Sequence, residues 1–175
     1  TTTVNDIGYQ FVTISDATAT SDTGIFTFSE VKIYEGTRVN YNYTVDSSNL
    51  EQQFIIPSSA VDTSTLLVNV QNSVSDTTTI TYTLNNDYNT LNSTSTKYFL
   101  QEVEAGRFEV YFGDGIIGKK PADGNIISLN YVVTNGDEAD GANAFVADST
   151  IGGYTDIAIT TVSASGGGSP AETVD

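Results

Sequence analysis

Apolar and polar side chains alternate along several short segments of the chain, most regularly in the two arms of residues 107–133. The apolar positions of these arms are Phe108, Val110 and Phe112, then Ile127, Leu129, Tyr131 and Val133. A period of two in aromatic and β-branched residues predicts half-buried strands. Glycines, aspartates and a proline fill the stretch between the arms, and these residue types favour turns. We therefore predict a hairpin with a long connection.

Shorter segments with the same alternation occur along the rest of the chain, at spacings of about ten residues, as in all-β domains. We predict strands at residues 9–14, 24–28, 31–34, 39–45, 54–56, 66–70, 80–84, 97–103 and 157–162. Residues 35–37 are the expected tight turn of a hairpin between two of these strands. Residues 104–106 are expected to turn the strand at 97–103 into the strand at 107–112.

No helical periodicity of useful length accompanies these strands, so the predicted fold is mostly β, in one or two antiparallel β-sandwich-like domains. In the two-domain version, one β-domain is inserted into the sequence of another, which serves as a base, and a loop and a C-terminal tail complete the chain. The parts are base β-strands at residues 1–29 and 144–165, an inserted antiparallel β-domain at 30–134, a loop at 135–143, and a linker with the start of a truncated helix at 166–175. The pattern alone does not choose between one domain and two.

The net charge of the chain narrows the classes of molecule that we expect it to bind. The chain has 175 residues, and 22 acidic against 6 basic side chains give a formal net charge of −16. Proteins that bind nucleic acid or anionic membranes use clustered lysines and arginines, which here are few and scattered. No apolar run reaches membrane-spanning length. We therefore expect neither a nucleic acid nor a membrane as a partner.

The sequence contains no histidine and no cysteine. Their absence removes the usual general base, the Ser-His-Asp triad, the commonest transition-metal ligand and any disulfide. An enzyme would have to work with carboxylates alone, as glycoside hydrolases do. We therefore predict a protein that is not an enzyme, with no catalytic residues, no cofactor and no catalytic metal.

The connection between the two arms partly matches a phosphate-binding P-loop. Gly113 and Gly118 have the required spacing, and Lys119 follows them. However, Lys120 occupies the position at which Ser or Thr binds magnesium, and Pro121 leads into a strand rather than a helix. We therefore interpret the glycines as residues that shape a turn.

Two loops rich in oxygen-bearing side chains, residues 85–89 and 137–141, are candidates for a structural calcium ion. Neither loop has the EF-hand pattern, and solvated turns use the same residue types. Whether a loop binds an ion is left open by the sequence.

A tail-fibre or cell-surface adhesin that binds carbohydrate is the alternative function. Its stacking platform would consist of Tyr34, Tyr41, Tyr43, Tyr82 and Tyr88. Against this reading, Tyr41 and Tyr43 alternate in step with valines on one strand face, which is typical of a core or an interface. The absence of tryptophan also weakens the carbohydrate hypothesis.

Glycine and turn residues recur in a definite order in the C-terminal half of the chain. The first series is Phe112, Gly113, Asp114, Gly115, Gly118, Pro121 and Gly124, followed by a strand that contains Tyr131. A loop with Gly136 and residues 141–143 follows. The last series is Gly166, Gly167, Gly168, Pro170 and Glu172. Over residues 98–175 this order resembles the baseplate J-like family, and within it the wedge proteins that form the inner ring of the baseplate in contractile-tailed bacteriophages (myoviruses).

The resemblance implies a structural, non-enzymatic part of a contractile-tail baseplate in the virion, assembled in the cytoplasm of the bacterial host. Its implied partners are other wedge proteins and copies of the same chain, so the full-length protein is expected to be a homo-oligomer. The first series of residues would shape the hairpin connection, and the last would shape a strand-to-helix junction. These roles are structural, and the resemblance carries over no residue that touches a partner.

Both ends of the sequence suggest a longer protein. The chain begins with Thr-Thr-Thr-Val and lacks methionine throughout. At the other end, Ser169, Pro170 and Glu172 have the spacing of an N-cap, a first-turn proline and the glutamate of a capping box. We therefore expect a fragment, with a helix only beyond its C-terminal cut.

Overall fold

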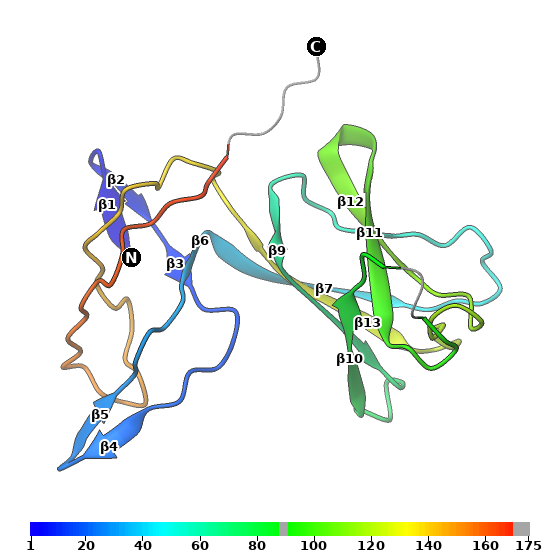
Figure 1. Ribbon diagram of the computed structural model, residues 1–175, viewed down its shortest axis with the longest axis horizontal. Helices are drawn as coiled ribbons and strands as arrows, with labels where there is room; N and C mark the ends of the chain where they lie inside the picture. Colours follow the sequence, from blue (N-terminus) through cyan, green and yellow to red (C-terminus); the bar gives the residue numbers. More distant parts are fainter. Residues whose placement is uncertain (88–90, 170–175) are drawn as a thin grey trace. The chain divides into compact units, whose positions relative to one another are not determined.

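The computed structural model describes residues 1–87 and 91–169 (Figure 1). Within these ranges the regular elements are β-strands and one short 3-10 turn, η2 (Glu104–Gly106). The strands are β1 (Thr2–Val4), β2 (Ile7–Tyr9), β3 (Phe11–Val12), β4 (Thr20–Asp22), β5 (Ile25–Thr27), β6 (Tyr34–Glu35), β7 (Thr37–Thr44), β8 (Phe54–Ile55), β9 (Val61–Gln71), β10 (Thr79–Leu84), β11 (Lys97–Val103), β12 (Arg107–Phe112) and β13 (Ile126–Val133). The prediction of a mostly β chain is therefore confirmed. Among the described residues there is no helix of the length and apolarity needed to cross a bilayer.

The chain divides into two compact units. Unit 1 comprises Thr1–Arg38 and Val133–Asp175, and unit 2 comprises Val39–Val132. Residues far apart in sequence meet in unit 1, where the Thr1 carbonyl accepts a hydrogen bond from the Val146 amide at 2.9 Å. Unit 2 is continuous in sequence and lies between the two segments of unit 1 along the chain.

Unit 2 is built around one sheet in the order β7-β13-β9-β10-β11-β12-β8. β10 pairs with β9, β11 with β12, and β12 with β8 in antiparallel fashion. β10 and β11 are parallel, with Thr83 opposite Lys97 and Leu84 opposite Tyr98. The expected antiparallel arrangement is therefore wrong for this pair. A tight hairpin would force two consecutive strands to pair antiparallel. The connection between β10 and β11 is long enough for β11 to start beside the end of β10 at which the chain enters the loop, and to run in the same direction.

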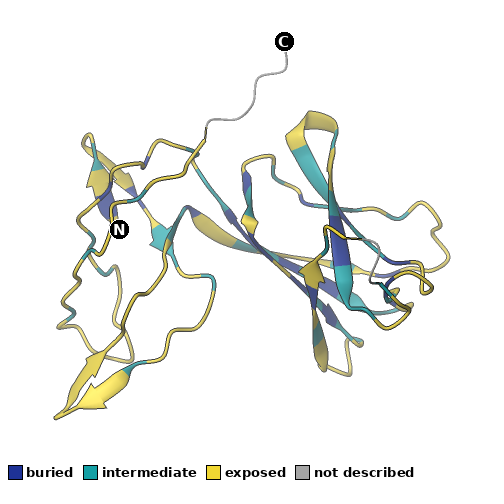
Figure 2. Ribbon diagram, in the orientation of Figure 1, coloured by how far each residue is buried: buried dark blue, intermediate teal, exposed yellow. Residues whose placement is uncertain are grey.

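The apolar core lies on the strands of this sheet, where Figure 2 shows most of the buried positions. Its fully buried aliphatic side chains are Ile56, Val68, Val110, Ile127, Leu129 and Val132. Thr65 is also buried, and its hydroxyl oxygen accepts a hydrogen bond from the Val132 amide at 2.9 Å. This hydrogen bond links β9 to β13 within the buried apolar core.

Aromatic rings connect the two edge strands of this sheet, β7 and β8. Tyr43 on β7 lies 5.5 Å from Phe54 on β8, measured between ring centroids, and its hydroxyl donates a hydrogen bond to the Ile55 carbonyl. Phe54 in turn lies 5.8 Å from Phe112, which lies 5.2 Å from Tyr82. The edge-on geometry of these rings is the favourable one for aromatic pairs. The sheet therefore curls on itself towards a barrel.

The predicted hairpin of residues 107–133 does not form. Its arms are β12 and β13, and β9, β10 and β11 lie between them in the sheet. Both edges of β12 are occupied, by β11 over six residue pairs and by β8 over two. The three-residue turn η2 fixes the β11–β12 pairing locally, as predicted, and this leaves no edge of β12 for β13.

The predicted hairpin across residues 35–37 is also wrong. β6 pairs with β3, with Tyr34 opposite Val12 and Glu35 opposite Phe11. β7 follows after Gly36 but joins β13 in the sheet of unit 2. Gly36 has a φ of 123°, and its amide donates a hydrogen bond to the Gln10 carbonyl at 2.9 Å. The glycine therefore redirects the chain between two sheets instead of closing a turn within one.

Unit 1 contains three two-stranded antiparallel sheets, β1–β2, β3–β6 and β4–β5. Within residues 144–165 there is no named strand, and an isolated bridge between Ile151 and Tyr154 is the only β-pairing described there. The predicted strand at residues 157–162 is therefore wrong. Two of its apolar side chains lie outside any core, since Ile159 and Val162 remain 46% and 81% exposed.

Candidate functional site

The connection that begins with Phe112 is a tight, internally bonded loop. One Asp114 carboxylate oxygen accepts hydrogen bonds from the amides of Ile116 and Ile117, both at 2.8 Å. The Ile117 and Ile116 amides together lower the pKa of this carboxyl below its ordinary value. The Gly115 amide closes the turn by donating to the Gly118 carbonyl at 3.0 Å. Asp114 thus uses its charge to fix the backbone of the loop.

Gly113 and Gly118 lie where the loop crosses itself. A Cβ atom on Gly113 would lie 2.2 Å from the Ile117 carbonyl oxygen and 2.5 Å from backbone atoms of Gly118. Gly118 has a φ of +85°, and its amide donates to the Asn92 carbonyl at 3.0 Å. Because a side chain at position 113 would overlap backbone atoms, only glycine fits this crossing.

The other residues of the first series are spread across unit 2. The Phe112 ring packs between Phe54 and Tyr82. Pro121 and Tyr131 are buried. Gly124 has a φ of +77°, and its amide donates to the Val45 carbonyl at 2.9 Å. These residues contact the core and the loops of unit 2, and they do not converge on one chemical site.

Ser165, the residue just before the last glycine series, is hydrogen-bonded to the loop at residues 135–143, within unit 1. The Ser165 amide donates to the Ala142 carbonyl at 2.8 Å, and the Gly141 amide donates to the Ser165 carbonyl at 3.0 Å. The Ser165 hydroxyl donates to the Ala139 carbonyl at 2.6 Å and accepts from the Ala142 amide at 2.8 Å. We call this arrangement the tail clasp.

Gly168 extends the tail clasp. A Cβ atom at this position would lie 2.4 Å from the Gly136 carbonyl oxygen and 2.6 Å from the Cα of Asp137. Gly167 has a φ of +95°, and Gly166 has open space around it. Pro170 and Glu172, which belong to the predicted helix start, lie outside the described residues. The two glycine-bearing segments that the sequence predicts separately therefore lie in direct contact.

Glu35 anchors the start of the same loop, and sequence reasoning missed it. Its two carboxylate oxygens accept hydrogen bonds from the Thr134 hydroxyl at 2.8 Å, the Asn135 amide at 2.9 Å and the Asn135 side chain at 2.7 Å. Glu138, in the same loop, accepts a hydrogen bond from the Tyr9 hydroxyl at 3.4 Å. Burial raises the Tyr9 pKa, and the Glu138 charge raises it further. Since Glu35 lies about 100 residues before its partners, no local pattern announces the contact.

The two candidate calcium loops lie apart from any cluster of acidic side chains among the described residues. No group of three or more acidic side chains there is placed to hold a metal. In the loop at residues 137–141, the Glu138 carboxylate faces Tyr9, and Asp140 lies 3.4 Å from the Gly168 amide. In the other loop, Asn85 and Asp87 are described, and residues 88 and 89 lie outside the described ranges.

The tyrosines proposed as a sugar platform do not share one exposed face. Tyr82 is 2% exposed and packs against Phe112. Tyr43 packs edge-on between Tyr41 and Phe54, whereas Tyr41 is 41% exposed. Tyr34 belongs to the other unit, on β6, and Tyr88 lies outside the described residues. Tyr43 and Tyr82 therefore serve as packing residues.

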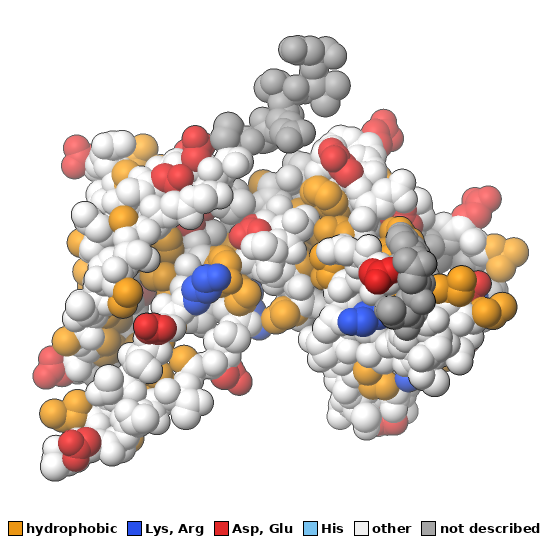
Figure 3. Space-filling model, in the orientation of Figure 1, with side chains coloured by type: hydrophobic (Ala, Val, Ile, Leu, Met, Phe, Trp, Pro, Cys, Tyr) orange, Lys and Arg blue, Asp and Glu red, His pale blue; other side chains and the backbone are white. Residues whose placement is uncertain are grey.

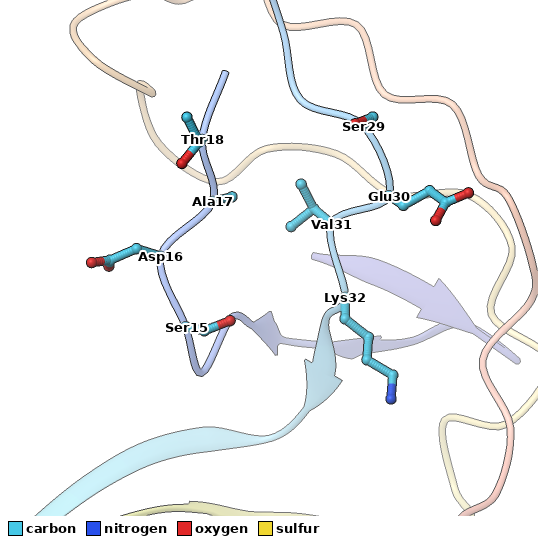
Figure 4. Close-up of a pocket in the computed structure, with 8 residues that line it drawn as sticks. All are labelled: Ser15, Asp16, Ala17, Thr18, Ser29, Glu30, Val31 and Lys32. Carbon is cyan, nitrogen blue, oxygen red and sulfur yellow. The ribbon is translucent and has the colours of Figure 1, made fainter. Parts of the chain in front are cut away.

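A gap of about 260 Å³ opens between residues 15–18 and 29–32 in unit 1 (Figure 4). Its charged side chains are Asp16, Glu30 and Lys32, and Figure 4 shows them pointing away from one another. A ligand site of this size normally has a few polar groups that converge on the ligand. This gap therefore has no recognisable chemistry of its own.

Comparison with known proteins gives a partial sequence match to a phage protein. No family model matches the chain. The chain is 35% identical over 101 residues to the baseplate wedge protein gp6 of Enterobacteria phage T4. The match covers 45% of this chain, and the chain spans 15% of the length of that relative. The chain is thus similar, over part of its length, to a small portion of a phage baseplate wedge protein.

Proposed function

We propose that this chain is a structural part of the baseplate wedge of a contractile-tailed phage, and that it joins subunits of the baseplate ring. The observation that carries the proposal is the partial identity to the baseplate wedge protein of phage T4. The order of glycine motifs resembling the baseplate J-like family supports the same assignment. In this role the chain is not an enzyme, and its partners are other wedge proteins and copies of itself.

The geometry fits a part whose loops keep a fixed shape. In unit 2, an aspartate and close-packed glycines fix the loop that follows Phe112. In unit 1, the tail clasp and Glu35 fix the loop at residues 135–143. Loops held by internal hydrogen bonds lose little entropy when a neighbour binds, which favours assembly in a defined orientation. We propose that the glycine motifs serve this structural purpose.

We further propose that unit 2 is an inserted domain carried by unit 1 as a base. The expected insert at residues 30–134 and the observed unit Val39–Val132 differ by several residues at the first boundary. The boundary between the first segment of unit 1 and unit 2 falls within β7.

A gene knockout tests the role in assembly. In the phage that encodes this chain, loss of the gene is expected to yield lysates whose tails lack a completed baseplate, as seen by negative-stain electron microscopy. Complementation with the intact gene should restore baseplates. Normal baseplates that lack only fibres, with loss of adsorption to host cells, would instead support the adhesin alternative and contradict the wedge assignment.

A further inference from the structure

Two pairs of consecutive apolar side chains stand out on the surface of the described residues. Ile25 and Phe26 are 67% and 52% exposed, and Ile116 and Ile117 are 77% and 51% exposed. Single exposed apolar residues are ordinary, but adjacent large ones mark places where a surface meets a partner. One pair lies in each unit, and the two pairs differ in the charges around them.

The first surface is the lysine-flanked tip, defined as residues 114–120 together with Lys97. Asp114 holds the amides of Ile116 and Ile117, so these side chains are displayed on a fixed turn. The Ser95 carbonyl accepts hydrogen bonds from the amides of both Lys97, at 3.0 Å, and Lys119, at 2.8 Å. The Lys120 Cβ lies 3.8 Å from where a Cβ of Gly115 would be.

Lys119 and Lys120 belong to the tip itself, and Lys97 is tied to it through its backbone amide, while the Lys97 ammonium donates to the Thr83 hydroxyl at 2.7 Å. Asp114 is the one acidic residue among the residues that define it, and its charge interacts with Lys120. The tip is therefore locally basic in a chain of net charge −16.

The second surface is the hairpin face, defined as the β4–β5 hairpin and Tyr154. All six strand residues of this hairpin are exposed. Thr23 and Gly24 at its turn have φ values of 47° and 85°, as in the two-residue turns that suit tight hairpins. The Phe26 ring lies 5.6 Å from the Tyr154 ring, and Tyr154 is itself 58% exposed. An aromatic and aliphatic patch therefore remains open to a partner.

Acidic side chains border the hairpin face. Asp22 is opposite Ile25 in the hairpin, and Asp16 and Glu30 lie on the segments that lead into and out of it. Figure 3 shows hydrophobic and acidic side chains side by side at the β4–β5 end of the molecule. In the whole of unit 1, Lys32 and Arg38 are the only basic residues of the sequence.

We propose that the lysine-flanked tip of one copy docks on the hairpin face of a second copy. The Ile116 and Ile117 side chains would meet the Ile25, Phe26 and Tyr154 patch, while Lys119 and Lys120 would face Asp22 and its acidic neighbours. Acidic copies repel each other in most orientations, so this one complementary pairing gives the contact its direction. The inference rests on the proposed structural function and names the partner as the same chain.

The contact joins different surfaces of the two copies, so it is head-to-tail. Repeated contacts of this type produce a ring when the rotation closes, and a filament when it does not. The surface involved is small for a stable interface, and we therefore expect weak association of isolated copies. Copies already held next to one another in an assembly would form the contact readily, because their effective concentration is high.

Sedimentation velocity of the full chain over a concentration series tests the contact. We expect reversible association that weakens as salt rises, because screening shortens the reach of the lysine and aspartate charges. The tip variant Ile116→Ser with Ile117→Ser and the hairpin variant Ile25→Ser with Phe26→Ser should each weaken association roughly tenfold or more. The control variant Leu50→Ser, at a 94% exposed isolated position, should leave association unchanged.

Mixing the two double variants provides the sharpest readout. Each variant keeps one intact surface, so an equimolar mixture should form a one-to-one dimer that grows no further, while wild type grows beyond a dimer. Lys119→Glu with Lys120→Glu should weaken association about fivefold to tenfold, and a partner carrying Asp22→Lys should recover part of that loss. Circular dichroism of each variant verifies that it is folded.

A wild-type chain that stays monomeric throughout the series would overturn the inference, as would a folded tip variant that associates like wild type. Failure of this contact can be distinguished from failure of the proposed baseplate role. A knockout without baseplates combined with monomeric wild type would leave the function standing and remove this contact. If the mixed variants form a one-to-one dimer but the protein is found outside the baseplate, the contact between copies stands and the proposed function is removed.

Discussion

At the scale of single residues, glycine positions decide the geometry of the two candidate loops. A Cβ at Gly113 would lie 2.2 Å from a carbonyl oxygen of the same loop, and a Cβ at Gly168 would lie 2.4 Å from a carbonyl oxygen of the loop at residues 135–143. Neither has a positive φ, so the reason for glycine at these positions is close approach of backbone. Gly115, by contrast, has a φ of +94° and ordinary space around it. The sequence marks all three as turn glycines and does not distinguish these causes.

Gly113→Ala is expected to destabilise the protein by about 2–4 kcal/mol, because the added methyl group overlaps the Ile117 carbonyl and the backbone of Gly118. Thermal unfolding followed by circular dichroism measures the effect. The matched control is Gly8→Ala, where a Cβ meets nothing within 4 Å and φ is not positive. Equal melting temperatures for the two variants would contradict the role assigned to the loop crossing.

Gly168→Ala is expected to loosen the tail clasp, since the methyl group overlaps the Gly136 carbonyl and the Asp137 Cα. Amide hydrogen exchange should then accelerate at Gly141 and Ser165, whose amides bridge the loop and the tail. Gly166→Ala serves as the control, because open space surrounds that position. Unchanged protection in the Gly168 variant would show that the clasp does not depend on this close approach.

At the scale of elements, strands and faces follow from the sequence far better than strand partners do. The strand at residues 97–103 and the turn after it form as predicted, because η2 links two strands that pair over six positions. Alternation also places Val110, Ile127 and Leu129 correctly in the core. A period of two defines which side chains share a face but carries no information about which strand lies alongside.

Long-range pairing explains the errors in the predicted topology. β12 and β13 are neighbours in sequence, yet three strands separate them in the sheet, and β13 lies between β7 and β9, which are far from it along the chain. Contacts between residues far apart in sequence also define the candidate site. The sequence indicated the glycine series, but the contact between Ser165 and the loop at residues 135–143 and the anchoring of that loop by Glu35 depend on tertiary structure. No spacing rule predicts them.

Thr65→Val is expected to destabilise unit 2 by about 1–3 kcal/mol, because it leaves the buried Val132 amide without its 2.9 Å partner. Valine has nearly the shape of threonine, so packing changes little. Chemical denaturation measures the free energy of unfolding. Thr81→Val is the control, since water replaces the lost bond of that exposed hydroxyl to Asn69 and the cost stays within about 0.5 kcal/mol.

At the scale of the whole molecule, the dominant physical property is an excess of acidic charge without any histidine. Tyrosine burial adds a second feature. Burial raises the pKa of Tyr43, Tyr82, Tyr98 and Tyr131 above the ordinary 10.0. Hydrogen bonds lower the carboxyl pKa below the ordinary 3.8 at Asp46, through the Ser48 hydroxyl first, and at Asp76, through the Asn72 side chain first.

These shifts predict the dependence of stability on pH. A tyrosine with a raised folded pKa stabilises the fold below pH 10.0, and this contribution is lost as pH rises through the folded pKa. An aspartate with a lowered folded pKa stabilises the fold above pH 3.8, and this contribution is lost as pH falls through the folded pKa. The melting temperature should therefore be nearly flat from about pH 5 to about pH 9 and fall on both sides. A clear transition near pH 6 to 7 would contradict this account.

The proposed baseplate role is tested most directly by locating the protein on the phage particle. Antibody raised against this chain and coupled to gold would be applied to purified phage and viewed by electron microscopy, before and after tail contraction. We predict label at the end-plate of the tail. Label along the tail fibres, or intact particles without label in either state, would contradict the wedge assignment.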